Sequence, residues 1–202
     1  MSFDRFLPAG IMALGLAILG GYAISQTSGP AIAAEDGPGP NLVIEVDGQT
    51  KGTVVIDLLP DVAPKHVAQI TALAQQGAYD GVVFHRVIDG FMAQTGDVQY
   101  GKAGGDTSMA GMGGSDLPDL PAEFSSVPFD RGVVGMARSQ DPNSANSQFF
   151  IMFAPAPHLD GQYTVVGQVI SGMDVVDAIK KGDGGNGEVS SPDVMAKVTV
   201  QP

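Results

Sequence analysis

Arg86 and the residues after it form the first group in this chain whose types and spacing suggest chemistry. The segment YDGVVFHRVIDGFMAQTGD, residues 79–97, places Phe91, Met92 and Gln94 shortly after the arginine. An arginine inside an apolar strand is costly unless its donors find partners or water. The segment therefore predicts an apolar pocket with a permanent cation beside it, and a surface ion pair of Arg86 is the alternative.

A second cluster, SANSQFFIMF at residues 144–153, adds an amide and an aromatic pair, and HLDGQYTVVGQV follows at residues 158–169. Successive side chains of a regular strand point to opposite faces, so His85 and Arg86 are expected on different faces. If Arg86 faces a groove, His85 is predicted to be a packed or hydrogen-bonded structural residue.

No other familiar catalytic pattern is present. The three histidines, His66, His85 and His158, show no HxH or HxxxH ligand spacing, and no serine lies in a GxSxG motif. The chain has no cysteine, which excludes disulfides and thiol catalysis. The stretch at residues 182–188 lacks EF-hand spacing and is predicted to be a plain turn. We expect no metal and no other cofactor, and a metal-dependent hydrolase is the weakest alternative.

Together, the three segments resemble the cyclophilin family of peptidyl-prolyl isomerases, from about Asn41 to Gln201. FHRVIDGFM matches the family's FHRxIxxFM motif, whose arginine points into the substrate groove. The resemblance implies a catalytic set of Arg86, Gln94 and Phe91, in which Gln94 holds substrate backbone and helps to orient Arg86.

The resemblance also implies a substrate-binding surface, in which an apolar pocket holds the proline ring and a short segment pairs with the peptide main chain. Arg138 stands in that segment where the family often has Asn, and Phe149 should face the core because it alternates with Phe150. Beside Phe91, the expected surface comprises Met92, Ala137, Arg138, Ser139, Gln148, Phe150, His158, Leu159 and Tyr163.

His158 departs from the family pattern, because relatives usually have Trp or Phe at this position. That tryptophan helps to bind cyclosporin. An imidazole offers a smaller and more polar surface, so we expect weak cyclosporin binding.

The activity that the resemblance implies is rotation about Xaa–Pro bonds, which crosses a barrier of about 18–20 kcal/mol without a catalyst. A guanidinium that donates more strongly to the twisted amide nitrogen than to the planar one would supply differential binding. The rival interpretation is a chaperone or scaffold that holds proline-containing segments without turnover. Arg86 together with Gln94 favours catalysis, because proline capture alone needs only the apolar pocket.

The N-terminal segment belongs to a different chemical regime. Residues 7–24 are almost wholly apolar and uncharged, and small residues at 31–34 precede the first acidic pair. This pattern predicts an export signal peptide or an N-terminal membrane anchor at residues 1–34, and a buried core helix is disfavoured by the glycines within it. A linker at residues 35–40 and an isomerase domain at residues 41–202 would follow, in the periplasm.

The chain carries 22 acidic and 10 basic residues, for a formal net charge of −12. This balance argues against binding nucleic acid or anionic lipid through a basic face. The expected partners are proline-containing polypeptide clients, with a possible membrane tether through residues 7–24.

Apolar, β-branched segments of strand length alternate with Gly, Asp and Asn turns after residue 40, and Asp47-Gly48 is a hairpin signal. The predicted fold class is mainly β, a closed eight-stranded antiparallel β-barrel capped by two α-helices, as the resemblance also implies. The eight predicted strands are Leu42–Val46, Thr53–Leu59, Val82–Ile88, Ala93–Asp97, Val133–Ala137, Gln148–Phe153, Thr164–Ile170 and Val194–Gln201.

Two helices interrupt the strands. The first is predicted after an N-cap at Asp61, with Pro64 in its opening turn and an end near Gly77. The second is predicted to open after Ser171 and to end with two lysines before residue 182. Two loops, at residues 98–116 and 139–147, are either ligand-approaching or passive surface loops.

Overall fold

The computed structural model describes residues 35–202. The signal peptide or anchor predicted at residues 1–34, with its possible tether at residues 7–24, lies outside the described residues. Within residues 35–202, no helix combines the length and the apolar character needed to cross a membrane.

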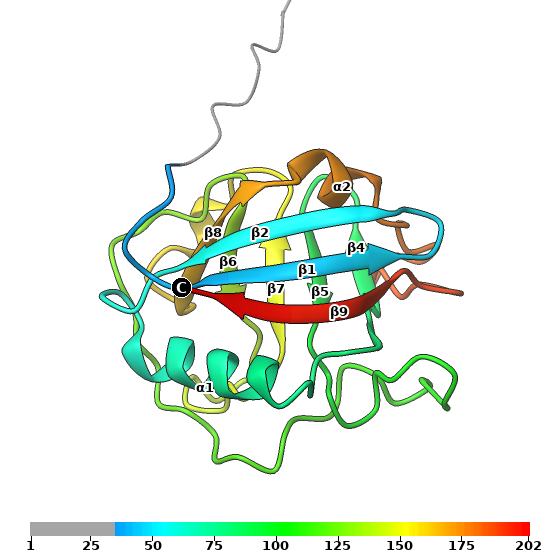
Figure 1. Cartoon of the computed structure of the whole chain (residues 1–202), viewed down its shortest axis with the longest axis horizontal. Coiled ribbons are helices and arrows are strands. Elements are labelled where there is room, and N and C mark those ends of the chain that lie inside the picture. The colour runs from blue at the N-terminus through cyan, green and yellow to red at the C-terminus, as the bar shows by residue number, and fades with distance from the viewer. Residues whose placement is uncertain (1–34) are drawn as a thin grey trace, which may run out of the picture. The chain divides into compact units, whose positions relative to one another are not determined.

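Among residues 35–202, one nine-stranded antiparallel sheet forms the body of the fold, with two helices beside it (Figure 1). The helices are α1 (Pro64–Gln75) and α2 (Met173–Ala178), and a short 3-10 turn, η1, spans Pro157–Leu159. The strands are β1 (Asn41–Asp47), β2 (Gly52–Leu58), β3 (Val82–Val83), β4 (Arg86–Ile88), β5 (Met92–Thr95), β6 (Val133–Met136), β7 (Phe149–Met152), β8 (Val165–Ser171) and β9 (Val194–Gln201).

The sheet curls because its two edge strands are neighbours in the chain. The strand order is β3-β9-β1-β2-β8-β6-β7-β5-β4, and three peptide steps from Val83 to Arg86, at most about 11 Å, join one edge to the other. The mainly β architecture with two helices is therefore confirmed. The curled sheet differs from the predicted closed eight-stranded barrel in two respects. It has nine strands, and among the described strands no ladder joins β3 to β4, so the chain itself connects the edges.

The ninth strand arises because the predicted strand Val82–Ile88 is divided. The Phe84 N–H donates to the Asp193 carbonyl, and the His85 carbonyl accepts from the Val189 N–H. Because of these bonds, the backbone of Phe84 and His85 leaves the hydrogen-bond ladder of the sheet, so β3 and β4 are separate strands.

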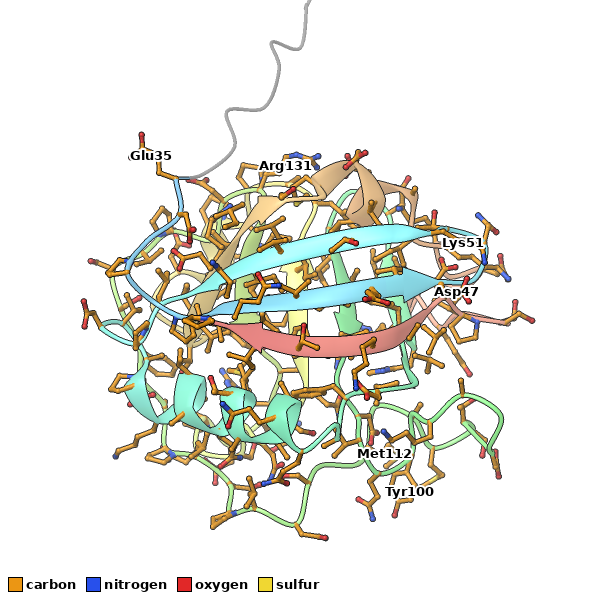
Figure 2. All side chains as sticks on the ribbon, viewed as in Figure 1. Glu35, Asp47, Lys51, Tyr100, Met112 and Arg131 are labelled. Carbon is orange, nitrogen blue, oxygen red and sulfur yellow. The ribbon has the colours of Figure 1, made fainter. Side chains whose placement is uncertain are left out.

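The first hairpin forms at the predicted Asp47-Gly48 turn. β1 pairs antiparallel with β2, with Val46 opposite Gly52. Asp47 and Lys51 form an ion pair of 2.5 Å at the tip of this hairpin (Figure 2).

α1 packs against β9, and α2 packs against β2 (Figure 1). The predicted N-cap at Asp61 is wrong, because the cap position of α1 is Ala63 and no side chain at that position bonds to the helix. A distant carboxylate takes the role instead: Glu123 accepts hydrogen bonds from the backbone N–H groups of Lys65 and His66. The capping group thus comes from another part of the chain, where a local pattern cannot reveal it.

α2 is shorter than predicted, because the chain leaves the helix at Ile179. The Ile179 side chain is buried in the core, and the Lys180 N–H donates to Asp193 Oδ2 at 2.8 Å instead of to a helix carbonyl. Lys180 and Lys181 therefore lie beyond the helix end.

Two hydrophobic clusters lie on opposite sides of the strands β5 and β7. Phe149 and Ile151 belong to the interior cluster, whereas Phe150 and Met152 belong to a second cluster that includes Met92. The prediction that Phe149 faces the core is confirmed, since its side chain is only 1% exposed. The second cluster forms the apolar floor of the site described next.

Candidate active site

Strand register places the main predicted site residues in one row. Arg86 in β4 is opposite Gln94 in β5, Gln94 is opposite Phe150 in β7, and Phe150 is opposite Gly135 in β6. Residues directly opposite each other on paired strands project from the same face of a sheet. The cation, the amide and the aromatic ring therefore lie side by side, although 64 positions separate Arg86 from Phe150 in the chain (150 − 86).

A cavity of about 190 Å³ opens over this row. Every residue that lines it belongs to the predicted site. The lining residues are Arg86, Phe91, Met92, Gln94, Ala137, Arg138, Phe150, Leu159 and Tyr163. The structure thus brings these residues together, while the part that each one takes in catalysis stays a prediction.

Arg86 is held by two hydrogen bonds to neutral partners. Its Nε donates to the Asn186 carbonyl at 2.9 Å, and its Nη1 donates to Gln94 Oε1 at 3.2 Å. Among the described residues, Arg86 forms no ion pair with a carboxylate. The alternative of a surface ion pair is therefore excluded within residues 35–202, and the cation faces the cavity without a neutralising anion.

Two further predicted residues lie in an adjoining hollow of about 350 Å³. Ser139 and Gln148 line this hollow, which shares Gln94, Ala137 and Arg138 with the cavity. Gln94 Nε2 donates to Gln148 Oε1 at 3.0 Å, so the two amides bridge the two spaces.

The segment at residues 137–139, predicted to pair with a peptide main chain, is partly occupied already. The Ala137 N–H donates to the Gln148 carbonyl, and the Ser139 N–H donates to Ser144 Oγ, both at 2.9 Å. Any main-chain pairing by this segment must therefore use its carbonyl groups or the N–H of Arg138.

The Arg138 side chain folds over Tyr163. Its guanidinium carbon lies 4.4 Å from the ring centroid, a cation–π contact, and its Nη2 donates to the Gln162 carbonyl at 3.0 Å. This contact closes one wall of the cavity. Sequence reasoning assigned only backbone contacts to Arg138 and missed this packing role.

His158 lies at the edge of the site instead of inside it. Its ring stacks on Phe91 with centroids 5.8 Å apart, and it lines neither the cavity nor the adjoining hollow. The turn η1 directs Leu159 inward, where it is buried, and leaves His158 exposed.

His85 lies beside Arg86 instead of on a separate face. Both residues line a third hollow, and the interruption between β3 and β4 explains why regular alternation fails here. The His85 side chain is packed, with 8% exposure, and neither ring nitrogen has a hydrogen-bond partner among the described residues. Burial is the main cause that lowers the pKa of His85 below its ordinary value of 6.5.

Two residues behind the cavity floor, Phe129 and Gly135, were not predicted from the sequence. The Phe129 ring stacks behind Phe150 with centroids 5.8 Å apart, and Gly135 lies against both rings. A Cβ on Gly135 would lie 2.6 Å from atoms of Phe129 and of Phe150, so the stack requires a glycine there. Only the strand register could have shown this.

The family model described as cyclophilin type peptidyl-prolyl cis-trans isomerase/CLD matches residues 42–200. This chain belongs to the cyclophilin family. A probable peptidyl-prolyl cis-trans isomerase of Brucella suis is 64% identical to this cyclophilin over 153 residues, which are 74% of this chain and 78% of that one. A Brucella abortus relative of the same description is 63% identical over the same lengths.

Solved cyclophilin structures share the fold. The crystal structure of a Hirschia baltica cyclophilin has 28% sequence identity and a TM-score of 0.67, over 82% of this chain and 75% of that one. A Cryptosporidium parvum cyclophilin, crystallised in the presence of the dipeptide Ala-Pro, has a TM-score of 0.68 and 24% identity, over 80% of this chain and 99% of that one.

The family fixes the activity. Cyclophilins bind proline-containing peptides, and this cyclophilin is a peptidyl-prolyl cis-trans isomerase. The predicted isomerase is confirmed, in preference to the scaffold and the hydrolase. In residues 35–202, no three His, Asp or Glu side chains gather in a way that could hold a metal ion.

Proposed function

We propose that this cyclophilin catalyses Xaa–Pro rotation through Arg86, which stabilises the twisted amide over its planar forms. The observation that carries the proposal is a guanidinium, unpaired with any described carboxylate, at the wall of a cavity whose floor is apolar. Arginine suits this role because it keeps its charge and can donate to a nitrogen that has regained its lone pair. Such a bond is stronger in the twisted state, which is the difference that catalysis requires.

The other cavity residues have separate tasks in this proposal. Phe91, Met92, Phe150 and Leu159 hold the proline ring, and no atom of the ring needs to move during rotation. Gln94 accepts from Arg86 at 3.2 Å, so it orients the guanidinium while its position beside the cavity allows contact with substrate backbone.

The test compares Arg86→Ala with Arg131→Ala. Arg131 is a surface arginine that pairs with Asp177 at 2.6 Å, so it controls for the loss of a guanidinium as such (Figure 2). We expect Arg86→Ala to lower kcat/KM for a proline-containing peptide by about 100-fold, as removal of one preorganised donor does elsewhere. Arg131→Ala should leave the rate unchanged. Unchanged turnover of folded Arg86→Ala would overturn the proposed role.

We also propose that this isomerase is exported and speeds the folding of proline-containing clients in the cell envelope. The support is the apolar, uncharged run at residues 7–24, followed by small residues before the first acidic pair. Both a cleaved signal peptide and an uncleaved membrane tether fit this pattern.

Cell fractionation followed by N-terminal sequencing tests the location. Material that begins near residue 34 or 35 in the periplasmic fraction would indicate a cleaved signal. An intact N-terminus in the membrane fraction would indicate a tether. An intact N-terminus in the cytoplasmic fraction would contradict export altogether.

A further inference from the structure

The loop at residues 98–116, here called the glycine loop, forms part of the wall beside the catalytic cavity. Gly111, Met112 and Gly113 line the adjoining hollow of about 350 Å³, and the Met112 side chain is 76% exposed (Figure 2). The loop contains no helix and no named strand. Its position therefore depends on contacts that tie irregular backbone to the barrel.

Asp97 supplies four of those contacts. Its side chain is 0% exposed, and its Oδ1 accepts from the N–H groups of Gln99 and Tyr100 at 3.1 and 2.8 Å. Its Oδ2 accepts from the N–H groups of Gly111 and Gly113 at 2.7 and 2.9 Å. A buried carboxylate is costly unless it is hydrogen-bonded, and here both oxygens are bonded twice. One side chain thus joins the start of the glycine loop to Gly111 and Gly113.

Gly113 must be a glycine for this arrangement to form. A Cβ at this position would lie 2.5 Å from Asp97 Oδ1 and 2.8 Å from the Cβ of Gln99. The close approach brings the Gly113 peptide group to one defined place.

A chain of hydrogen bonds leads from that peptide group to Arg86. Gln148 Nε2 donates to the Gly113 carbonyl at 2.7 Å, and Gln94 Nε2 donates to Gln148 Oε1 at 3.0 Å. Arg86 Nη1 then donates to Gln94 Oε1 at 3.2 Å. A carbonyl only accepts, so it forces Gln148 to present its NH₂ to the loop and its oxygen to Gln94. Gln94 must in turn present its oxygen to Arg86.

We propose that Asp97 is a positioning residue for the isomerase reaction, which holds the Gly113 carbonyl so that Gln148 presents its oxygen to Gln94 and Gln94 presents its oxygen to Arg86. This inference rests on the proposed role of Arg86. Without Asp97 the Gly111 and Gly113 N–H groups lose their acceptor, so the Gly113 carbonyl is held less firmly and either amide can turn over more easily. A turned Gln94 would present an NH₂ group to the guanidinium, which has only donors, and Arg86 would lose its orientation.

The first experiment measures kcat and KM for Asp97→Asn and Asp97→Ala, with Asp106→Ala as the matched control. The exposed Asp106 carboxylate lies in the same loop and accepts from the Ser108 N–H at 2.9 Å, outside the chain to Arg86. We expect Asp97→Ala to lower kcat by about tenfold with little change in KM, Asp97→Asn to fall between, and Asp106→Ala to match wild type. An unchanged kcat in folded Asp97→Asn and Asp97→Ala would overturn the proposal.

The second experiment separates positioning from a general structural loss. In an Arg86→Ala background, Asp97→Asn should cause no further fall in kcat, because its effect passes through Arg86. An equal fall in both backgrounds would overturn the proposal. If Arg86→Ala alone leaves kcat unchanged, the proposed function fails, which is a different and recognisable outcome.

A third measurement covers the case in which Asp97 variants fail to fold. Gln148→Met breaks the chain while Asp97 and the glycine loop stay intact, so it should reproduce the loss of kcat. In ¹⁵N NMR spectra the Arg86 Nε–H resonance should shift in Gln148→Met and stay in place in Asp106→Ala. A Gln148→Met variant with wild-type kcat and an unshifted Arg86 resonance would overturn the proposal.

Discussion

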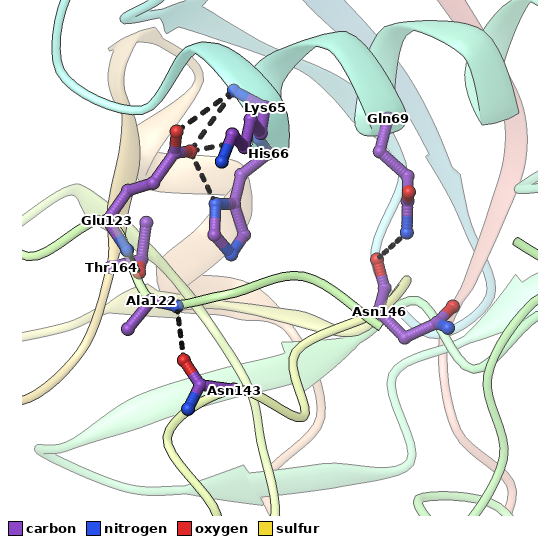
Figure 3. A network of polar contacts seen from close by, with 8 residues as sticks. All are labelled: Lys65, His66, Gln69, Ala122, Glu123, Asn143, Asn146 and Thr164. Atoms are coloured by element: carbon purple, nitrogen blue, oxygen red, sulfur yellow. Dashed lines mark hydrogen bonds and ion pairs between the residues drawn. The ribbon is translucent and has the colours of Figure 1, made fainter. Parts of the chain in front are cut away.

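Asp97 and Glu123 each hold backbone N–H groups in place through a carboxylate, but the hydrogen-bond networks of the two carboxylates lead to different side chains. Asp97 ties down the glycine loop, and its chain of bonds ends at Arg86 beside an open cavity. Glu123 caps α1 through the N–H groups of Lys65 and His66, and its Oε2 lies 2.6 Å from Nδ1 of the fully buried His66 ring (Figure 3).

The comparison shows how one kind of contact can serve two purposes. Backbone N–H groups that lack an internal partner are satisfied by a carboxylate in both places. At α1 the network ends at the buried His66 ring, so it contributes to the stability of the fold. At the cavity the network ends at Arg86, a cation that faces the cavity, so we infer a contribution to turnover.

The largest effect that would sharpen this contrast is a loss of stability in Glu123→Ala. The variant leaves the His66 ring and two helix N–H groups without their acceptor, which should cost about 3 kcal/mol of unfolding free energy. Denaturant unfolding measures this loss, while kcat/KM of the folded variant should equal that of wild type.

Asn143→Ala is the control for Glu123→Ala. It removes an exposed acceptor from the neighbouring Ala122 N–H, at 3.1 Å, and should cost less than about 0.5 kcal/mol (Figure 3). A tenfold loss of kcat/KM in folded Glu123→Ala would break the contrast, because the α1 side would then also serve turnover.

Lowering the pH should reduce the stability that the two regions contribute, in a separate pH range for each. Burial first, and Arg86 to a smaller extent, lowers the pKa of His85, although Asp97 opposes the shift. The unfolded chain therefore binds a proton below its ordinary pKa of 6.5 while the folded protein does not, so stability falls as the pH drops below 6.5 and levels off below the folded pKa.

Glu123 titrates in a lower range. Burial raises the pKa of its carboxyl, but hydrogen bonds from the His66 ring and the α1 backbone outweigh burial, so the pKa lies below its ordinary 4.5. Its contribution to stability is present above 4.5 and is lost as the pH falls through the folded pKa.

Denaturant unfolding at a series of pH values separates the two groups. The free energy of unfolding should depend less on pH in His85→Gln than in wild type just below pH 6.5. In Glu123→Gln the dependence should be smaller only below pH 4.5. Identical curves for wild type and both variants would contradict this assignment.

Cyclosporin probes the rim of the cavity, where His158 stacks on Phe91. We expect weak inhibition of the wild-type isomerase and stronger inhibition of His158→Trp, because indole buries more apolar area. Inhibition constants for the two proteins check this, and nanomolar inhibition of wild type would show that the imidazole does not limit binding.

The smallest expected effect is on the pH dependence of the rate. Arginine does not titrate near neutrality, so kcat/KM should be nearly constant from about pH 6 to pH 9. A bell-shaped profile of the folded enzyme would instead indicate a titrating group in the reaction, such as His158 or a carboxylate.

Local sequence patterns predicted most of the strands and both helices, and the family resemblance predicted the residues that line the cavity. Alternation separates Phe149 from Phe150, and the hairpin signal at Asp47-Gly48 sets the first strand pair. The family motif supplied Arg86 and Phe91, and Gln94 follows it by two residues in the same short segment.

Tertiary structure decided the contacts that join distant segments. Glu123 reaches the N–H of His66 across 57 residues, and Gln148 reaches the Gly113 carbonyl across 35 residues. In each case one or both partners is a backbone group, which every residue type has, so no residue pattern marks it. The packing of Phe150 against Gly135 likewise depends on strand register, and register exists only after the sheet has assembled.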